Sequence, residues 1–274
     1  ELSDVPHDAR PRIRIGVGGI ERTAPGFVGP SADLPQKREL EYASGKLTSI
    51  EINGTYYGSQ KPESFARWHD ETPDDFVFAV KGPRFATNRR MLSEAGESVE
   101  RFFSSGVMAL RDKLGPINWQ FMPTKKFDPD DFAGFLSLLP KSLEGRQIRH
   151  AVEVRHDSFR TPDFVALARE HGVAIVLAAD SDYPQIADVT APFVYARIMG
   201  TSEANKLGYP ETALDLWAER TRLWASGGAA DGVQTVTSQP ADGIGRDVFL
   251  YVISGFKARN PLAAKALIDR LALV

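Results

Sequence analysis

The sequence predicts one TIM-like (β/α)8 barrel of parallel strands, and three observations lead to that fold class. Eight apolar, β-branched or aromatic runs of strand length recur along the 274 residues, and helix-like segments lie between most of them. No internal repeat or shift of composition marks a second domain. Alternating strands and helices indicate a parallel sheet, and eight such units fit the length of a (β/α)8 barrel. We expect a single domain over residues 1–274, with a doubly wound open sheet as the alternative.

The strands are expected where Ile, Val, Phe and Tyr concentrate, because these residues favour extended backbone. In order, they are Ile13–Gly19, Ser49–Tyr57, Phe76–Gly82, Pro116–Met122, His150–His156, Val173–Asp180, Phe193–Gly200 and Asp247–Gly255. Helices are expected over residues 33–44, 97–114, 128–140, 161–172, 209–225 and 260–274. Three of them open on Asp, Ser or Thr, and several carry Pro in the first turn, which are typical helix starts.

Three segments depart from the regular alternation. Residues 181–193 are too few and too polar for a good helix, so we expect one degenerate βα unit near strand 6. Residues 226–246 are rich in Gly, Ala and Asp and predict an irregular excursion before the last strand. Residues 1–11 are expected to form an N-terminal tail.

Polar residues alternate with apolar ones on strands that a barrel should bury. Side chains alternate across a strand, so if the apolar set packs under the helices, the polar set points inward. The outward set is Ile50, Ile52, Phe76, Phe78, Val80, Ile117, Trp119, Phe121, Val152, Val154, Val194, Ala196 and Ile198. The inward set is Glu51, Asn53, Thr55, Lys81, Asn118, Gln120, Glu153, Arg155, Tyr195 and Arg197. Charges there must pair with each other or meet water, because desolvating one alone costs several kcal/mol.

Several inward residues lie near the carboxyl ends of strands, where barrels of this type place their active sites. The candidate catalytic residues are Glu51, Glu153 and His156. The candidate ligand-binding residues are Asn53, Lys81, Arg84, Gln120, Arg155, Asp180 and Arg197. A glutamate beside an arginine stays ionised and can act as a base, and a histidine at a strand end can move protons. The alternative is a satisfied interior network of ion pairs without chemistry.

Composition limits the classes of function. The net charge of −3 gives no reason to expect a general nucleic-acid or membrane binder, and the absence of cysteine excludes thiolate chemistry and disulfides. No apolar run has the length of a membrane span and the start lacks a signal-peptide core, so the expected location is the cytoplasm.

Metal and cofactor signals are weak. No H-x-H, HExxH, Walker A, GxGxxG or G-x-S-x-G motif occurs among these residues, so we expect no cofactor. Oxygen ligands for Mg²⁺ or Mn²⁺ at Glu51, Glu153 or Asp180 are a minor alternative.

Five segments in a fixed order resemble a known family. EINGTYY, FAVKGPRFAT, LGPINWQ, VEVRHDSF and YARIMG are similar to segments of the DUF72, or YecE-like, family, from about Ile13 to the final helix. The resemblance implies a TIM-barrel fold and no established activity. The chain departs from the family pattern at Asn88, Phe159 and Met199, where the family commonly has His, Trp and His. It also departs in the first loop, at residues 18–30, and in the segment ISGFKARN.

The loops after the strands carry more basic than acidic residues. The segment KGPRFATNRRM, for instance, holds Lys81, Arg84, Arg89 and Arg90 and no acid. We therefore expect an enzyme that acts on a small anionic ligand, bearing phosphate or carboxylate, in a cationic pocket at the C-terminal face. A barrel that binds or processes nucleic acid and a non-catalytic ligand-binding barrel are the two alternatives.

Overall fold

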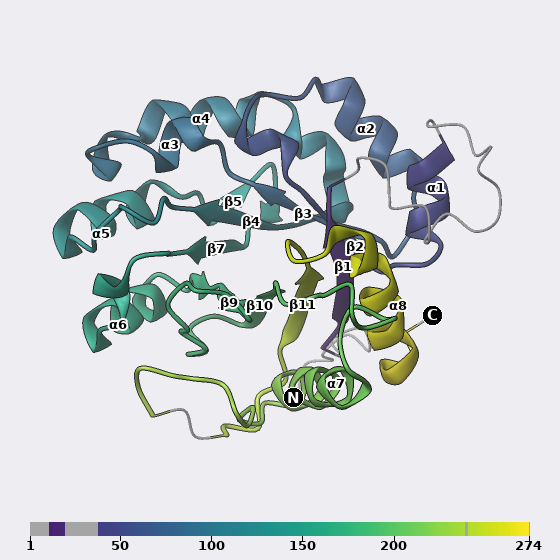
Figure 1. Ribbon diagram of the computed structural model, residues 1–274. Helices are drawn as coiled ribbons and strands as arrows, with labels where there is room; N and C mark the ends of the chain where they lie inside the picture. Colours follow the sequence, from purple (N-terminus) through teal and green to yellow (C-terminus); the bar gives the residue numbers. More distant parts are fainter. Residues whose placement is uncertain (1–10, 20–37, 239–240, 274) are drawn as a thin grey trace, which may run out of the picture.

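The computed structural model describes residues 11–19, 38–238 and 241–273, and its strands form a barrel surrounded by helices (Figure 1). The strands of the main sheet are β1 (Ile13–Gly18), β2 (Ser49–Ile52), β3 (Val77–Lys81), β4 (Leu114–Gln120), β7 (His150–Glu153), β8 (Ala174–Ile175), β9 (Leu177–Ala179), β10 (Phe193–Ile198) and β11 (Asp247–Val252). All their pairings are parallel, in the order β8-β7-β4-β3-β2-β1-β11-β10-β9. Only Val176 separates β8 from β9, so the two ends of the sheet are halves of one barrel strand. The predicted TIM-like fold is confirmed.

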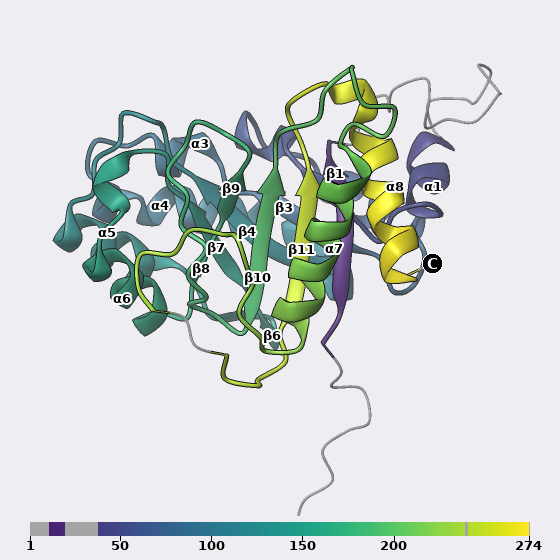
Figure 2. The same ribbon diagram turned by 60° about the horizontal axis from the view of Figure 1, so that its bottom comes forward.

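Helices cover the outside of the sheet, and α7 and α8 lie against the strands β11 and β1 (Figure 2). They are α1 (Glu39–Ser44), α2 (Pro62–Asp70), α3 (Arg84–Thr87), α4 (Gly96–Ser104), α5 (Pro129–Leu138), α6 (Pro162–Glu170), α7 (Glu211–Ala225) and α8 (Asn260–Leu271). Short 3-10 helices span Gly54–Tyr56, Leu92–Glu94, Val107–Lys113, Asp157–Phe159 and Lys257–Arg259, and β5 (Ser142–Leu143) and β6 (Arg146–Gln147) form a small hairpin.

Local sequence explains where two of the helices begin. The side chain of Asp128 accepts a hydrogen bond from the Asp131 backbone N–H at the start of α5, and Thr161 accepts one from Phe164 at the start of α6. Each cap is followed by a proline at the first helical position, whose fixed φ suits a helix start and which has no N–H to satisfy.

Two predicted elements are corrected by the structure. The single helix expected over residues 97–114 is two pieces, because Gly106 adopts φ 121° between α4 and the 3-10 helix Val107–Lys113. The strand expected to run to Tyr57 ends at Ile52 and becomes a 3-10 helix. Thr55 therefore does not continue the strand alternation; its hydroxyl donates to the Lys81 carbonyl oxygen at 2.7 Å and ties this turn to the end of β3.

Two segments outside the regular alternation are irregular where they are described. Residues 181–192 contain no helix or strand, which confirms the degenerate unit after β9. Residues 226–238 and 241–246 also contain no helix or strand. The first of these segments is tied to the irregular segment after β9, because Asp188 accepts hydrogen bonds from the backbone N–H groups of Val236 and Thr237 at 2.7 and 2.9 Å. Residues 1–10 of the predicted tail, the start of the helix expected over 33–44 and most of the divergent first loop lie outside the described residues.

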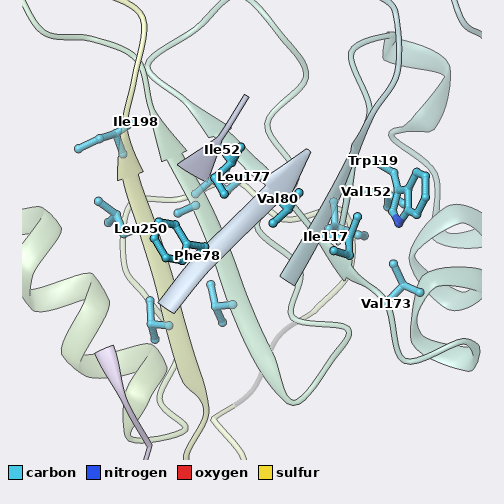
Figure 3. Packing of buried hydrophobic residues seen from close by; sticks show 14 of the residues in the cluster. Ile52, Phe78, Val80, Ile117, Trp119, Val152, Val173, Leu177, Ile198 and Leu250 are labelled. Atoms are coloured by element: carbon cyan, nitrogen blue, oxygen red, sulfur yellow. The ribbon is translucent and has the colours of Figure 1, made fainter. Parts of the chain in front are cut away.

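Two apolar layers follow from strand alternation. The outer layer, between sheet and helices, includes Phe78, Val80 and Trp119 (Figure 3). The inner layer fills the barrel with residues such as Val77, Ala79 and Tyr195. These positions confirm the predicted outward and inward faces of β3, β4 and β10.

Candidate functional site

Six of the predicted inward side chains meet inside the barrel at the carboxyl ends of its strands. They come from five strands or the residues just beyond them: β2, β3, β4, β7 and β10. The members of this interior cluster are Glu51, Lys81, Gln120, Glu153, Arg155 and Arg197.

Arg197 on β10 is the centre of the cluster. Its Nη2 atom donates to Glu51 Oε1 at 2.8 Å, and its Nη1 atom donates to Glu153 Oε1 at 2.8 Å. Burial alone would lower the pKa of this guanidinium, but the two carboxylates raise it above its ordinary value. Arg197 is therefore a permanent cation that two glutamates compensate.

Glu153 is held by a second arginine as well. Arg155 donates from Nε to Glu153 Oε2 at 2.9 Å, and its guanidinium lies 4.1 Å from the centre of the Tyr183 ring. Burial would raise the pKa of Glu153, but Arg197 and Arg155 outweigh it and lower the pKa from 4.5 to about 2. This carboxylate is ionised at neutral pH and is a weak base.

Glu51 is enclosed like Glu153. It accepts a hydrogen bond from the Tyr195 hydroxyl, and the exposed fraction of both glutamates is 0%. Burial and the Glu51 carboxylate raise the pKa of Tyr195 well above its ordinary value, so the phenol stays a proton donor. Both carboxylates thus lie beneath the arginine and not at an open surface.

Lys81 differs from the other cations of the cluster. Its Nζ atom donates to Gln120 Oε1, and no described carboxylate lies within ion-pair distance of it. Burial is the larger cause, and Arg197 the next, of a pKa lowered from 10.5 to about 8. Glu51 and Glu153 act in the opposite direction but do not cancel these two effects.

A cavity of about 790 Å³ lies over this cluster at the barrel mouth. Its lining comes from the ends of β1, β2, β3, β4 and β10 and from the segment after β11. The side chains that matter below are Asn53, Tyr56, Tyr57, Lys81, Gln120, Arg197 and Lys257. Among the described lining residues three are cationic and none is acidic.

Asn53 adds an unused polar group to this cavity. Its Oδ1 atom is buried and has no partner among the described residues. Its Nδ2 atom lies 2.7 Å from where a Cβ on Gly18 would stand, so only glycine at that position leaves room for the amide. A buried polar atom without a partner is costly, and a ligand in the cavity could satisfy it.

Besides Asn53, three other predicted site residues lie outside the interior cluster. Arg84 is exposed on α3, with its guanidinium 5.7 Å from the Tyr57 ring centre at the rim of the mouth. Asp180 is exposed and accepts a hydrogen bond from the Tyr209 hydroxyl at 2.8 Å. His156 accepts a hydrogen bond from the Ser158 backbone N–H at 3.1 Å and caps the 3-10 helix Asp157–Phe159.

The described residues hold no group of three or more His, Asp or Glu side chains arranged to bind a metal ion. Arg197 occupies the oxygens of both glutamates, and no described contact joins Asp180 to them. Within the same residues, no helix has both the length and the apolar character needed to cross a bilayer.

The model of the family described as "Protein of unknown function DUF72" matches residues 23–274. The chain belongs to the DUF72 family. It is 31% identical over 120 residues to the UPF0759 protein YecE of Escherichia coli K12, a match that covers 44% of this chain and 42% of YecE. The match therefore spans less than half the length of this curated relative.

Crystal structures of two DUF72 family proteins have the same fold. The protein of Thermotoga maritima MSB8 gives a TM-score of 0.72 at 20% identity, over 95% of this chain and 99% of that one. The protein of Enterococcus faecalis V583 gives 0.67 at 18% identity, over 97% and 99%. At these identities the likeness concerns the fold alone.

The departures from the family pattern have defined places in the structure. Asn88 is exposed and accepts a hydrogen bond from the Tyr56 hydroxyl at 3.4 Å, whereas Phe159 is fully buried among aromatic rings. Met199 is 9% exposed and packs in the inner apolar layer.

Two partners of the cluster were not among the predicted site residues: Tyr195, which was assigned only to the inward face, and Tyr183, which was not predicted at all. The sequence could have indicated Tyr195 as a partner, because it lies two positions before Arg197 on β10 and so points to the same face. No such pattern indicates Tyr183, since it lies in the irregular segment after β9.

Proposed function

We propose that this DUF72 protein is an enzyme that acts on a small anionic molecule, bearing a carboxylate or phosphate, in the cavity at the barrel mouth. The observation that carries the proposal is the charge of the lining: Lys81, Arg197 and Lys257 face the cavity, and no described acid does. The cavity volume of about 790 Å³ lies in the range of small-molecule sites.

The charges inside the cluster favour the same ligand class. Glu51 and Glu153 carry two negative charges against Arg155, Arg197 and Lys81, so the cluster has one positive charge in excess when Lys81 is protonated. An anion beside Lys81 would balance this charge in a partly desolvated site, where such pairs are strong.

The glutamates support the site from below. Glu51 and Glu153 do not line the cavity themselves, but both bind Arg197, which does. They hold its guanidinium in one orientation, which preorganises it for a ligand. A direct role of Glu51, Glu153 or His156 as acid or base stays a prediction, as does binding of the ligand by Arg84 or Asp180.

Thermal unfolding at constant ionic strength tests the proposal. Inorganic phosphate, acetate and 3-phosphoglycerate are each compared with sodium chloride and with glycerol, which lacks a charge. We expect at least one anion to raise Tm in a saturable way, as binding to the native state requires. Lys81→Met should lose this shift, while Lys265→Met keeps it, because Lys265 lies on α8 and pairs with Asp269. If no anion exceeds sodium chloride, or if Lys81→Met responds like the wild type, the proposal is wrong.

A rim of aromatic rings favours nucleic acid as the second candidate. Tyr57 and Phe85 are 65% and 63% exposed, and the Arg84 guanidinium lies within 5.8 Å of both ring centres. Exposed rings with an adjacent cation are suited to stacking on bases. This candidate predicts that a single-stranded oligonucleotide binds at low salt and that Phe85→Ala weakens its binding. Equal binding by the wild type and Phe85→Ala would count against it.

A further inference from the structure

Lys81 is more buried than binding an anion requires, and it lacks the carboxylate partner that the two arginines of the cluster have. It is the last residue of β3, its side chain points into the barrel, and it is 5% exposed while lining the cavity. Arg197 and Arg155 both have carboxylate partners, but Lys81 has none within ion-pair distance among the described residues.

The surroundings of Lys81 Nζ leave a neutral amine stable and accessible. Gln120 Oε1 accepts one N–H bond, and the Tyr56 ring centre lies 5.8 Å away. A neutral amine that donates one hydrogen to Gln120 retains a lone pair, and the cavity is the open side of the residue.

Electrostatics favours the neutral form at moderately alkaline pH. Burial and the nearby Arg197 lower the pKa of Lys81 to about 8. At pH 8 about half of Lys81 is neutral, whereas an exposed lysine with an ordinary pKa of about 10.4 is neutral in well under a hundredth of molecules. Desolvation beside a second cation is one of the known ways in which an enzyme activates a lysine nucleophile.

Gln120 places this amine beside the permanent cation. Its Oε1 atom accepts from Lys81 Nζ and lies 3.5 Å from Arg197 Nη1, so amine and guanidinium adjoin one acceptor. A ligand with an anionic group next to a carbonyl could place the anion on Arg197 and the carbonyl carbon at Lys81.

We propose that Lys81 is a nucleophile, and that the ligand of this site is a small anion that also carries an aldehyde or ketone, such as a 2-oxo acid. This inference rests on the proposed function and adds the substrate class to it. The lone pair of neutral Nζ forms a bond to the carbonyl carbon. The carbonyl oxygen leaves as water after it takes one proton from solvent and one hydrogen from the amine, and the other amine hydrogen stays on the iminium nitrogen. One amine, one carbonyl and one proton thus yield a protonated Schiff base and one water, without an oxidant or reductant.

Reductive trapping in the wild-type protein tests the proposal. Glyoxylate or pyruvate is added with sodium borohydride at pH 8, and the modified lysines are identified by peptide mass mapping. We expect Lys81 to be modified at least about tenfold faster than Lys265, because far more of it is neutral at this pH. Its rate should rise with pH to a plateau with a midpoint near 8. This comparison uses two residues of one sample and needs no variant.

A variant of Lys81 separates its proposed role as a nucleophile from its role as a cation that binds the anion. Lys81→Arg keeps the positive charge but lacks the amine, so it should retain the Tm shift with phosphate and form no adduct at position 81. If Lys81 is trapped no faster than Lys265 while the anion shift depends on Lys81, the nucleophile is wrong and the anion site stands. If neither trapping nor a Tm shift occurs, both proposals fail.

Discussion

Replacing Glu153 by glutamine should destabilise the protein by about 3 kcal/mol at pH 7. Glutamine has nearly the same shape but lacks the charge, so Arg197 and Arg155 lose a shared partner inside the barrel. The pKa of Glu153 falls from 4.5 to about 2 on folding, and a difference of about 2.5 units corresponds to about 3 kcal/mol. The usual cost of removing one member of a buried ion pair is of the same size, about 3–5 kcal/mol.

The pH dependence has a definite sign. Because the folded-state pKa is the lower one, this stabilisation is fully present above pH 4.5 and is lost as the pH falls towards 2. The difference between wild type and Glu153→Gln should therefore shrink to about 1 kcal/mol at pH 3.

Urea unfolding followed by circular dichroism measures both quantities. Asp242→Asn is the matched control, since the pKa of Asp242 is also lowered to about 2, mainly by Arg246, but Asp242 lies at the surface with its side chain 40% exposed. The control should change the free energy of unfolding far less, because exposed pairs contribute little. A Glu153→Gln protein as stable as the wild type at pH 7, or a difference that stays constant with pH, would refute the reasoning.

Three further substitutions test the fold around the site. Thr161→Ala removes the cap of α6 and should lower the free energy of unfolding by about 1 kcal/mol, measured by urea unfolding; an unchanged midpoint would contradict the cap. Trp119→Ala empties a fully buried site under the helices and should cost about 3–5 kcal/mol by the same measurement, and a cost below about 1 kcal/mol would mean that the site is not packed as described. Gly16→Ala would place a Cβ 1.9 Å from the Ser49 carbonyl oxygen, so we expect expression to give little soluble folded protein. A yield and Tm equal to those of the wild type would disprove this close approach of β1 and β2.

Most of the fold was predictable because the two faces of a barrel strand differ in polarity along the sequence. On β3 the alternation of Phe78 and Val80 with Ala79 and Lys81 is enough to assign each side chain to the outer or the inner layer. Where glycine or a turn ended an element early, as at Gly106 and after Ile52, the pattern continued in the sequence although the backbone did not.

The candidate site was predictable as a set but not as a network. Alternation and position at strand ends indicated that Glu51, Glu153 and Arg197 would share the interior. Which of the cations would lack a carboxylate depends on how β2, β7 and β10 face one another across the barrel, and no local pattern records that register.

Local periodicity and the order of motifs were thus sufficient to predict the barrel, its inward polar face and the resemblance to DUF72. The sealing of the glutamates beneath Arg197, and the position of Lys81 at the cavity without a carboxylate partner among the described residues, follow from the three-dimensional arrangement alone. The difference arises because charge pairing and desolvation are set by distances between residues far apart in the chain.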